Sequence, residues 1–298
     1  MKRKKFKVRG IAALLVLLAA AGFLGALTEY MSPSLRVDEE HLKPPHKSIS
    51  ASVEAPSVSA EGAVLINSDS GRILYEKNPD EKLYPASTTK IMTALVALET
   101  LEELGLGIDS KVIVPVEAAG IEGSSLYLKA GEKLSLEELL YGLILQSGND
   151  SAEAIAICVG GTKENFVEKM NRRAEELGCS GTHFVNPSGL FDEKHYTTAG
   201  DLAVIASEAM KRDDFRKIAG ARRWSSEETD RSFVNKNKTV FNYEGGNGVK
   251  IGFTKKSGRT LVASAQRDGK ELIAVVLKDG NWFNDAYALM DYGFGLEQ

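Results

Sequence analysis

Ser87 and Lys90 have the residue types and the spacing of an activated nucleophile. They follow Pro85 and stand at the start of the apolar stretch 91–98. Side chains three apart on a helix share a face, so the Lys90 amine can reach the Ser87 hydroxyl. The N-terminus of a helix also stabilises an alkoxide and a neutral amine, which favours attack by the serine oxygen. This motif alone leaves open that Ser87 is an ordinary N-cap and Lys90 is solvated.

Two further short segments offer polar groups from rigid supports. Ser147 and Asn149 lie in a polar turn between two apolar helical runs and would present a hydroxyl and an amide. Lys250 and Gly252 lie in an expected strand, where the lysine supplies a cation and the glycine permits a close approach to the backbone. Taken singly, the first segment also fits a plain helix–helix turn.

The elements that must position these groups follow from hydrophobic periodicity. Expected strands lie at 63–67 and 72–76, expected helices at 87–98, 136–145, 151–159, 163–177 and 198–210, further strands at 248–253, 259–266 and 271–277, and a last helix at 284–292. Ser135 and Glu138 form an expected capping box, and Asp268-Gly269 an expected hairpin turn. The order predicts an α+β fold: one antiparallel sheet built from both ends of the sequence, flanked by helices and with an inserted helical subdomain.

Composition excludes several classes of function. The 298 residues are 43% hydrophobic, enough for a sizeable core. Residues 31–298 carry 31 of the 37 basic and 40 of the 41 acidic side chains, so no nucleic-acid partner is expected for this acidic part. Neither a glycine-rich phosphate loop nor a G-x-S-x-G nucleophile turn occurs.

No metal site or cofactor is expected. H-E-x-x-H is absent, and of the four histidines His41 and His46 lie in the proline- and serine-rich stretch at 31–60. Cys158 and Cys179 match no metal-binding spacing, and we expect two separate thiols.

The N-terminal 60 residues predict export and a spacer. Residues 1–30 carry six basic side chains and then a run of 17 apolar or glycine residues at 11–27, which is typical of a signal peptide or an N-terminal membrane anchor. The excess of positive charge places the chain after residue 27 outside the cytoplasm, in the cell envelope. Residues 31–60 form a Pro/Ser-rich linker, and residues 61–298 form the expected catalytic domain.

The three polar segments together resemble the serine acyl-enzymes that recognise penicillin, with S-x-x-K, S-x-N and K-x-G in the same order. The sequences of these segments are most similar to those of the low-molecular-mass D-alanyl-D-alanine carboxypeptidases, and the resemblance covers about residues 60–293. The matching segments are Tyr84-Pro85-Ala86-Ser87-Thr88-Thr89-Lys90, Leu145-Gln146-Ser147-Gly148-Asn149-Asp150, Phe184-Val185-Asn186-Pro187-Ser188-Gly189-Leu190 and Lys250-Ile251-Gly252-Phe253-Thr254. The resemblance implies a β-lactamase/transpeptidase-like fold.

It also implies a reaction and roles for four catalytic residues. The enzyme would remove the terminal D-alanine from peptidoglycan stem pentapeptides through an acyl-enzyme, and β-lactam antibiotics would acylate it. Ser87 would be the nucleophile and Lys90 would take and return its proton. Ser147 would relay a proton to the leaving D-alanine, and Asn149 would hold the substrate's amide.

Five further residues are expected to bind substrate. By the same resemblance, Lys250 faces the terminal carboxylate, and the backbone N–H of Phe253 joins that of Ser87 in the oxyanion hole. Lys236 matches a position where relatives often have another cationic or imidazole group. Gly252 and Thr254 belong to the same strand segment.

Ile251 departs from the family pattern, because relatives have Thr or Ser there to bind the substrate carboxylate. Losing one charge-assisted hydrogen bond costs about 1.5–3 kcal/mol. Activity is then slow, restricted to an unusual substrate or dependent on Thr254. Two alternatives therefore stay open: a β-lactamase-like hydrolase, and a catalytically weakened envelope binding module.

Overall fold

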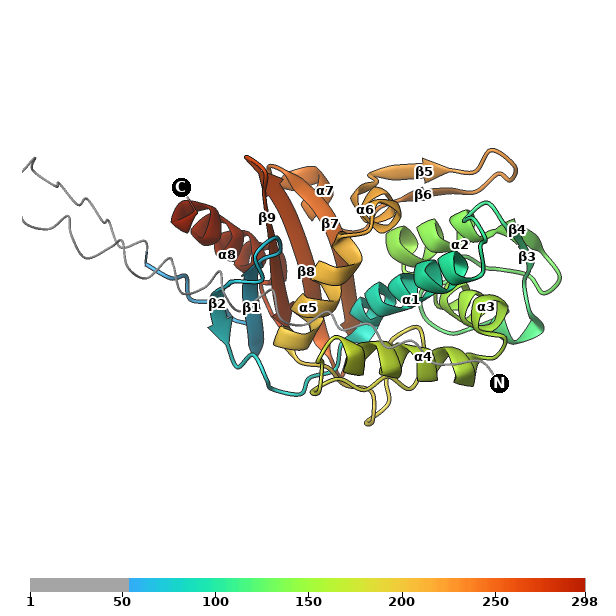
Figure 1. Ribbon diagram of the computed structural model, residues 1–298, viewed down its shortest axis with the longest axis horizontal. Helices are drawn as coiled ribbons and strands as arrows, with labels where there is room; N and C mark the ends of the chain where they lie inside the picture. Colours follow the sequence, from blue (N-terminus) through green and yellow to red (C-terminus); the bar gives the residue numbers. More distant parts are fainter. Residues whose placement is uncertain (1–53, 298) are drawn as a thin grey trace, which may run out of the picture. The chain divides into compact units, whose positions relative to one another are not determined.

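The computed structural model describes residues 54–297, in which a five-stranded antiparallel sheet has helices on both faces (Figure 1). The strand order is β2-β1-β9-β8-β7, so that β7 and β2 are the two edges. The strands are β1 (Gly62–Asn67), β2 (Ile73–Lys77), β7 (Gly246–Thr254), β8 (Gly258–Arg267) and β9 (Lys270–Leu277). The predicted α+β class is confirmed, with a sheet made from both ends of the sequence.

Pairing between β1 and β9 joins the two ends of the chain into this sheet. Ala63 of β1 lies opposite Val276 of β9, and all neighbouring strands are antiparallel. The predicted hairpin turn between β8 and β9 is present, because Asp268 and Gly269 both have positive φ values, 50° and 77°. Two residues in this conformation connect strands with the right-handed twist of a sheet.

The helical block and two small strand pairs lie beside the sheet (Figure 1). The helices are α1 (Lys90–Glu103), α2 (Leu136–Tyr141), α3 (Asn149–Gly160), α4 (Lys163–Glu176), α5 (Ala199–Met210), α6 (Asp213–Gly220), α7 (Thr239–Asn242) and α8 (Trp282–Leu296), with 3₁₀ turns at Ala86–Thr89 and Val116–Ala118 and a π-helix at Gly142–Gln146. The small strands are β3 (Lys111–Ile113), β4 (Lys133–Ser135), β5 (Arg223–Ser225) and β6 (Ser232–Val234). Periodicity missed α6, α7 and these four strands, which are too short to repeat a pattern.

The predicted capping box is present in part, since the Ser135 hydroxyl accepts from the Glu138 N–H.

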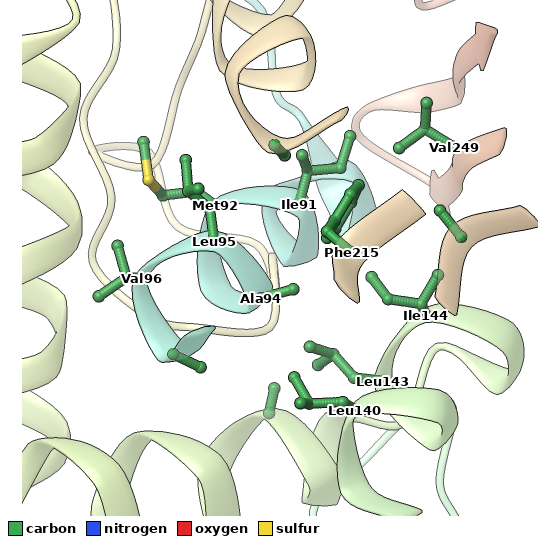
Figure 2. Close-up of a cluster of buried hydrophobic side chains, with 14 of the residues drawn as sticks. Ile91, Met92, Ala94, Leu95, Val96, Leu140, Leu143, Ile144, Phe215 and Val249 are labelled. Carbon is green, nitrogen blue, oxygen red and sulfur yellow. The ribbon is translucent and has the colours of Figure 1, made fainter. Parts of the chain in front are cut away.

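Two hydrophobic clusters cover the two faces of the sheet. One lies under α8, where Leu289 and Met290 pack against strand residues such as Leu261 and Ala263. The larger cluster lies on the other face and continues into the helical block, with α1 at its centre. Residues 90–98 of α1 are all buried, and Figure 2 shows their apolar side chains between α2, the π-helix and Phe215. Because α1 is held on all sides, its first turn has a fixed position.

Several predictions concern residues outside the described range. The signal or anchor at 1–30 and most of the linker lie there, although Val58 and Ala60 are already buried against the α8 side of the sheet. Between residues 54 and 297, no helix has both the length and the apolar character needed to cross a membrane. Cys158 and Cys179 are free thiols, as expected.

Candidate active site

Ser87 and Lys90 occupy consecutive turns at the entrance to α1. Ser87 lies in the 3₁₀ turn Ala86–Thr89, and α1 begins at Lys90. The Lys90 Nζ atom lies 3.0 Å from the Ser87 Oγ atom. The N-cap of the 3₁₀ turn is Pro85 and that of α1 is Thr89, and neither makes a side-chain cap hydrogen bond, so Ser87 is not an ordinary N-cap. Lys90 is fully buried, which also excludes the solvated alternative.

Three oxygen atoms surround the Lys90 amine. Besides Ser87, the Asn149 Oδ1 atom lies at 2.7 Å and the Ser188 carbonyl oxygen at 2.6 Å. The latter two only accept hydrogen bonds, so each takes one N–H of the lysine. A neutral amine has two N–H groups and one lone pair, and the lone pair is therefore left facing the Ser87 hydroxyl. This arrangement makes neutral Lys90 a base for Ser87.

The surroundings favour the neutral form of this lysine. Burial, followed by the charge of Lys250, lowers the pKa of Lys90 well below its usual range, and Lys236 acts in the same direction. Asp150 acts in the opposite direction. Complete burial removes water's stabilisation of the ammonium form and so favours the neutral amine, which is the form that accepts a proton.

The side-chain amide of Asn149 is oriented by a neighbouring loop. Its Nδ2 atom donates to the Glu122 carbonyl at 2.7 Å, and its backbone N–H donates to the Ser124 carbonyl at 2.7 Å. The Oδ1 atom is thereby turned toward Lys90. Asn149 opens α3, directly after the turn that contains Ser147.

Asp150 fastens this loop to α3. Its carboxylate accepts from the backbone N–H groups of Leu126 and Leu128 and from the Ser125 hydroxyl. The side chain is completely buried, so these donors take the place of water. Sequence reasoning assigned Asp150 no role, although it follows Asn149 directly.

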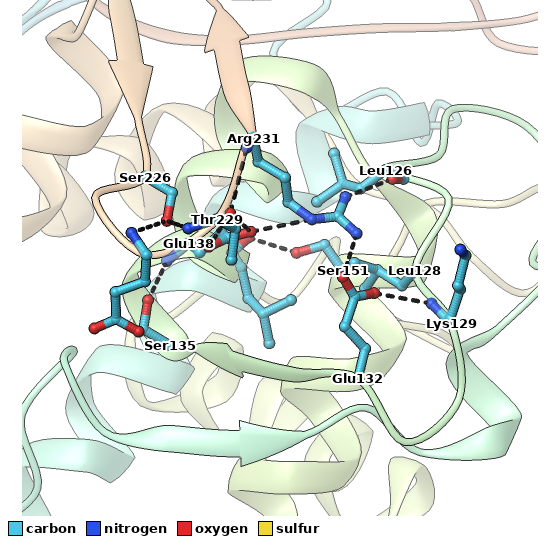
Figure 3. Close-up of polar contacts among 12 residues, drawn as sticks. Leu126, Leu128, Lys129, Glu132, Ser135, Glu138, Ser151, Ser226, Thr229 and Arg231 are labelled. Carbon is cyan, nitrogen blue, oxygen red and sulfur yellow. Dashed lines mark hydrogen bonds and ion pairs between the residues drawn. The ribbon is translucent and has the colours of Figure 1, made fainter.

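A second network holds the same loop from outside (Figure 3). Arg231, between β5 and β6, donates to the Leu126 carbonyl at 2.7 Å and to the Glu132 carboxylate at 2.7 Å. It also lies 3.1 Å from the buried carboxylate of Glu138 in α2. The β5–β6 hairpin therefore supports the loop that orients Asn149.

Ser147 lies at a strained position two residues before Asn149. It follows the π-helix and has φ 65° and ψ 33°, a left-handed conformation that is uncommon for residues other than glycine. The side chain is buried, with 5% of its surface exposed. The Lys236 Nζ atom donates to the carbonyl of Gln146, the preceding residue, at 2.8 Å. Ser147 and Lys236 therefore belong to the same side of the site.

Strand β7 passes close to the nucleophile at Gly252. A β-carbon on Gly252 would lie 2.9 Å from the Ser87 backbone nitrogen and 2.4 Å from the Thr260 Oγ1 atom. Thr260, opposite Gly252 on β8, donates to the Pro85 carbonyl at 3.0 Å. Only glycine fits between these groups, so the predicted close approach is to the backbone of Ser87.

Lys250 is a buried cation on the same strand. It is 1% exposed, and its Nζ atom donates to the Ile251 carbonyl at 3.1 Å. Burial, and then the charge of Lys236, lowers the pKa of Lys250 to about 7. Burial removes the water that would stabilise the Lys250 ammonium, and a bound anion would replace that stabilisation. Lys250 is therefore suited to bind a carboxylate.

Ile251, Phe253 and Thr254 differ in where their side chains lie. Ile251 is opposite Leu261 and packs, partly buried, on the cluster under α8. The Phe253 side chain is 64% exposed. The Thr254 hydroxyl is engaged with Ser257, whose backbone N–H donates to it at 2.9 Å. Of these three residues, only Phe253 has a freely accessible side chain.

Two more contributors were missed by sequence reasoning. Ser188 binds Lys90 through its backbone carbonyl group. Every residue has this group, so the residue type does not reveal the contact. Its turn is fixed by Asn186, whose Oδ1 atom accepts from the N–H of Ser188 and of Gly189. His195 holds the hydroxyl of Thr89, at 2.8 Å, and burial lowers the pKa of His195 to about 3. Segment 184–190 had been singled out because its sequence resembles that of the family. That resemblance was the signal that could have led to Ser188.

Comparison with known proteins gives the family of this chain. The family described as D-alanyl-D-alanine carboxypeptidase matches residues 49–281. The chain belongs to the D-alanyl-D-alanine carboxypeptidase family. It is 42% identical over 220 residues to the D-alanyl-D-alanine carboxypeptidase DacF of Bacillus subtilis, covering 73% of this chain and 57% of that protein. It is 36% identical over 267 residues to DacC of Escherichia coli, covering 81% and 63%.

Solved structures of similar proteins share this carboxypeptidase-family fold. The Streptomyces K15 DD-transpeptidase aligns with a TM-score of 0.75 and 34% identity, covering 81% of this chain and 99% of that one. Penicillin-binding protein D2 of Listeria monocytogenes, solved in its ampicillin-bound form, aligns with a TM-score of 0.74 and 28% identity over 81% and 99%. The chain spans 57% of the length of DacF and 63% of the length of DacC.

Proposed function

We propose that this protein is a serine D-alanyl-D-alanine carboxypeptidase that removes the terminal D-alanine from peptidoglycan stem pentapeptides. The observation that carries the proposal is the geometry at Lys90. Two pure acceptors occupy two of its three hydrogen-bonding positions, and the third faces the Ser87 hydroxyl at 3.0 Å. Family membership gives the substrate class.

In the first half of the reaction, the Ser87 Oγ atom attacks the carbonyl carbon of the penultimate D-alanine. Its proton moves to the lone pair of Lys90 as the C–O bond forms. The backbone N–H groups of Ser87 and Phe253 stabilise the oxyanion, by about 3 kcal/mol each as in other acyl-transfer sites. Lys250 and Lys236 attract the terminal carboxylate.

In the second half, the C–N bond breaks and the terminal D-alanine leaves as an amine. The proton held by Lys90 reaches the leaving nitrogen through the Ser147 hydroxyl, and Asn149 holds the substrate's amide. A water molecule then attacks the ester carbonyl and gives a proton to Lys90, which passes it to the Ser87 Oγ atom as the ester C–O bond breaks and the product acid is released. A β-lactam acylates Ser87 by the same attack and C–N bond cleavage, with its ring nitrogen as the leaving group.

Labelling with a fluorescent penicillin tests the nucleophile and separates the alternatives. We expect stoichiometric labelling of the protein and none of Ser87→Ala, with Ser110→Ala as a matched serine control that still labels. Slow release of the label together with release of D-alanine from a synthetic pentapeptide supports the carboxypeptidase. Fast release of the label indicates a β-lactamase, and absence of label indicates a binding module.

We propose that the protein works in the cell envelope, tethered to the outer face of the cytoplasmic membrane or released from it. The support is the sequence of residues 1–30, with its basic start and 17-residue apolar run. N-terminal sequencing of the mature protein distinguishes a cleaved signal from a retained anchor. A mature protein found in the cytoplasm with residue 1 intact would contradict the proposal.

A further inference from the structure

The charges along β7 give the direction in which a stem peptide lies. In the proposed reaction Lys250, which is buried on β7, and Lys236 attract the terminal carboxylate, so the leaving residue lies toward the Lys250 end of the strand. The carbonyl under attack lies near Gly252, where β7 meets the Ser87 backbone nitrogen. The rest of the peptide must then emerge at the other end of β7, beyond Phe253. The next residue of an extended peptide is about 3.5 Å further on.

Two aromatic rings, from segments that adjoin the Ala86–Thr89 turn, take no part in the reaction steps. The rings of Tyr84 and Phe191 meet edge to face, with centroids 5.0 Å apart. Tyr84 precedes Pro85, whose carbonyl is bound by Thr260 opposite Gly252. These contacts tie Tyr84 to the Gly252 end of β7.

Phe191 is tied to the same place from a different part of the chain. It follows Gly189 by two residues, and a β-carbon on Gly189 would lie 1.8 Å from the Ala86 carbonyl oxygen. The Leu190 carbonyl accepts from the Asn186 side chain at 2.9 Å, which fixes the backbone just before Phe191. Phe191 is nevertheless 44% exposed, so the pair presents apolar surface to solvent.

A cation completes this surface. The Lys256 Nζ atom lies 5.9 Å from the centroid of the Phe191 ring. Lys256 belongs to the turn after β7, where Thr254 and Ser257 bind each other through two backbone-to-hydroxyl hydrogen bonds of 2.9 Å. The lysine side chain is exposed on a rigid backbone.

The chemistry of this surface matches one kind of side chain. Aromatic rings pack against an aliphatic stem, and the ammonium of Lys256 binds a carboxylate. Asp192 and Glu193, both exposed, follow Phe191 in the chain and offer acidic partners to an ammonium group. An aliphatic stem that ends in both a carboxylate and an ammonium therefore has complementary groups here, whereas a stem with an ammonium alone leaves Lys256 unpaired.

We propose that Tyr84, Phe191 and Lys256 form a subsite for the side chain of the third residue of the stem peptide, and that it favours diaminopimelate over lysine. This inference rests on the proposed carboxypeptidase function. Position three is the residue immediately before the D-alanine that is attacked, and it is the first whose side chain can reach beyond Phe253. Tyr84 and Phe191 contact its methylene groups, and Lys256 binds the distal carboxylate of diaminopimelate.

The test compares two synthetic pentapeptides that differ only at position three, meso-diaminopimelate or L-lysine. The measurement is kcat/KM for D-alanine release, expressed as the ratio of the two peptides at low ionic strength. We expect the protein to favour the diaminopimelate peptide, and Lys256→Glu to lower the ratio about fivefold, which corresponds to roughly 1 kcal/mol for an exposed ion pair. Lys255→Glu, an equal charge change on the adjacent exposed residue, should change the ratio less than twofold.

Phe191→Ala supplies a second readout, because it removes contacts with the methylene stem that both side chains share. Phe191→Ala should lower kcat/KM for both peptides about equally, so that the ratio of the two kcat/KM values does not change. A ratio near one in the wild-type protein, or equal effects of Lys256→Glu and Lys255→Glu, would overturn the subsite while D-alanine release still supports the carboxypeptidase. Release from neither peptide would overturn the proposed function and the subsite together.

Discussion

We expect the buried ammonium of Lys250 to make the proposed carboxypeptidase activity sensitive to pH. Burial and Lys236 lower the pKa of Lys250 to about 7, so the group loses its charge as the pH rises through neutrality. Lys90 acts in the opposite sense, because it must be neutral to accept a proton and its own pKa is lowered. We expect kcat/KM to rise with pH as Lys90 loses its proton and to fall again as Lys250 does.

The size of the alkaline fall follows from the Lys250 pKa. At pH 9 only about 1% of a group with a pKa near 7 is protonated, so kcat/KM can fall up to ~100-fold below its plateau. Lys236→Gln removes a neighbouring positive charge and should move the fall to higher pH. An exposed charge such as that of Lys236 contributes about 0.7 kcal/mol, which corresponds to a shift of about half a pH unit.

The assay is D-alanine release from a pentapeptide between pH 5 and pH 10 at constant ionic strength. Lys238→Gln is the matched control, because Lys238 is an exposed lysine two residues further along and does not contribute to the lowered pKa of Lys250. The position of the alkaline limb is the readout, since Lys236→Gln also weakens carboxylate binding. A flat profile between pH 7 and pH 9, or a limb that Lys236→Gln and Lys238→Gln move equally, would refute the reasoning.

Two other substitutions have definite expected outcomes. Ile251→Thr should raise D-alanine release and penicillin acylation about tenfold or more through one charge-assisted hydrogen bond, while lowering the free energy of unfolding by about 1 kcal/mol because Ile251 packs under α8. No gain in either rate would show that this hydroxyl is irrelevant here. Lys250→Met should abolish D-alanine release yet raise the melting temperature by a few degrees, because a buried charge is replaced by an apolar side chain. An unchanged or lower melting temperature would contradict this account.

The parts of the site that depend on residue type and local spacing could be predicted from the sequence. Ser87 and Lys90 could be paired in advance, because three residues on a helix fix their distance to within a side chain's reach. The turn at Asp268-Gly269 could also be predicted, since that dipeptide favours positive φ.

The rest depends on contacts that residue type does not encode. The Ser188 carbonyl is an acceptor present in every residue, and only the packing of Gly189 against Ala86 brings it to Lys90. The three-residue strands β5 and β6 are too short for alternation to register, although Arg231 between them supports the loop around Asn149. Strain at Ser147 is likewise a property of the folded turn.

The pairing of β1 with β9 has a consequence for how the protein matures. Ala63 can pair with Val276 only after all the residues between them have been synthesised, so the pairing of β1 with β9 forms late. Until then β7 and β8 have no completed sheet to hold them against the first turn of α1. We therefore expect a nascent chain that lacks β9 to be unable to react with penicillin, and acylation to begin only once β9 has paired with β1.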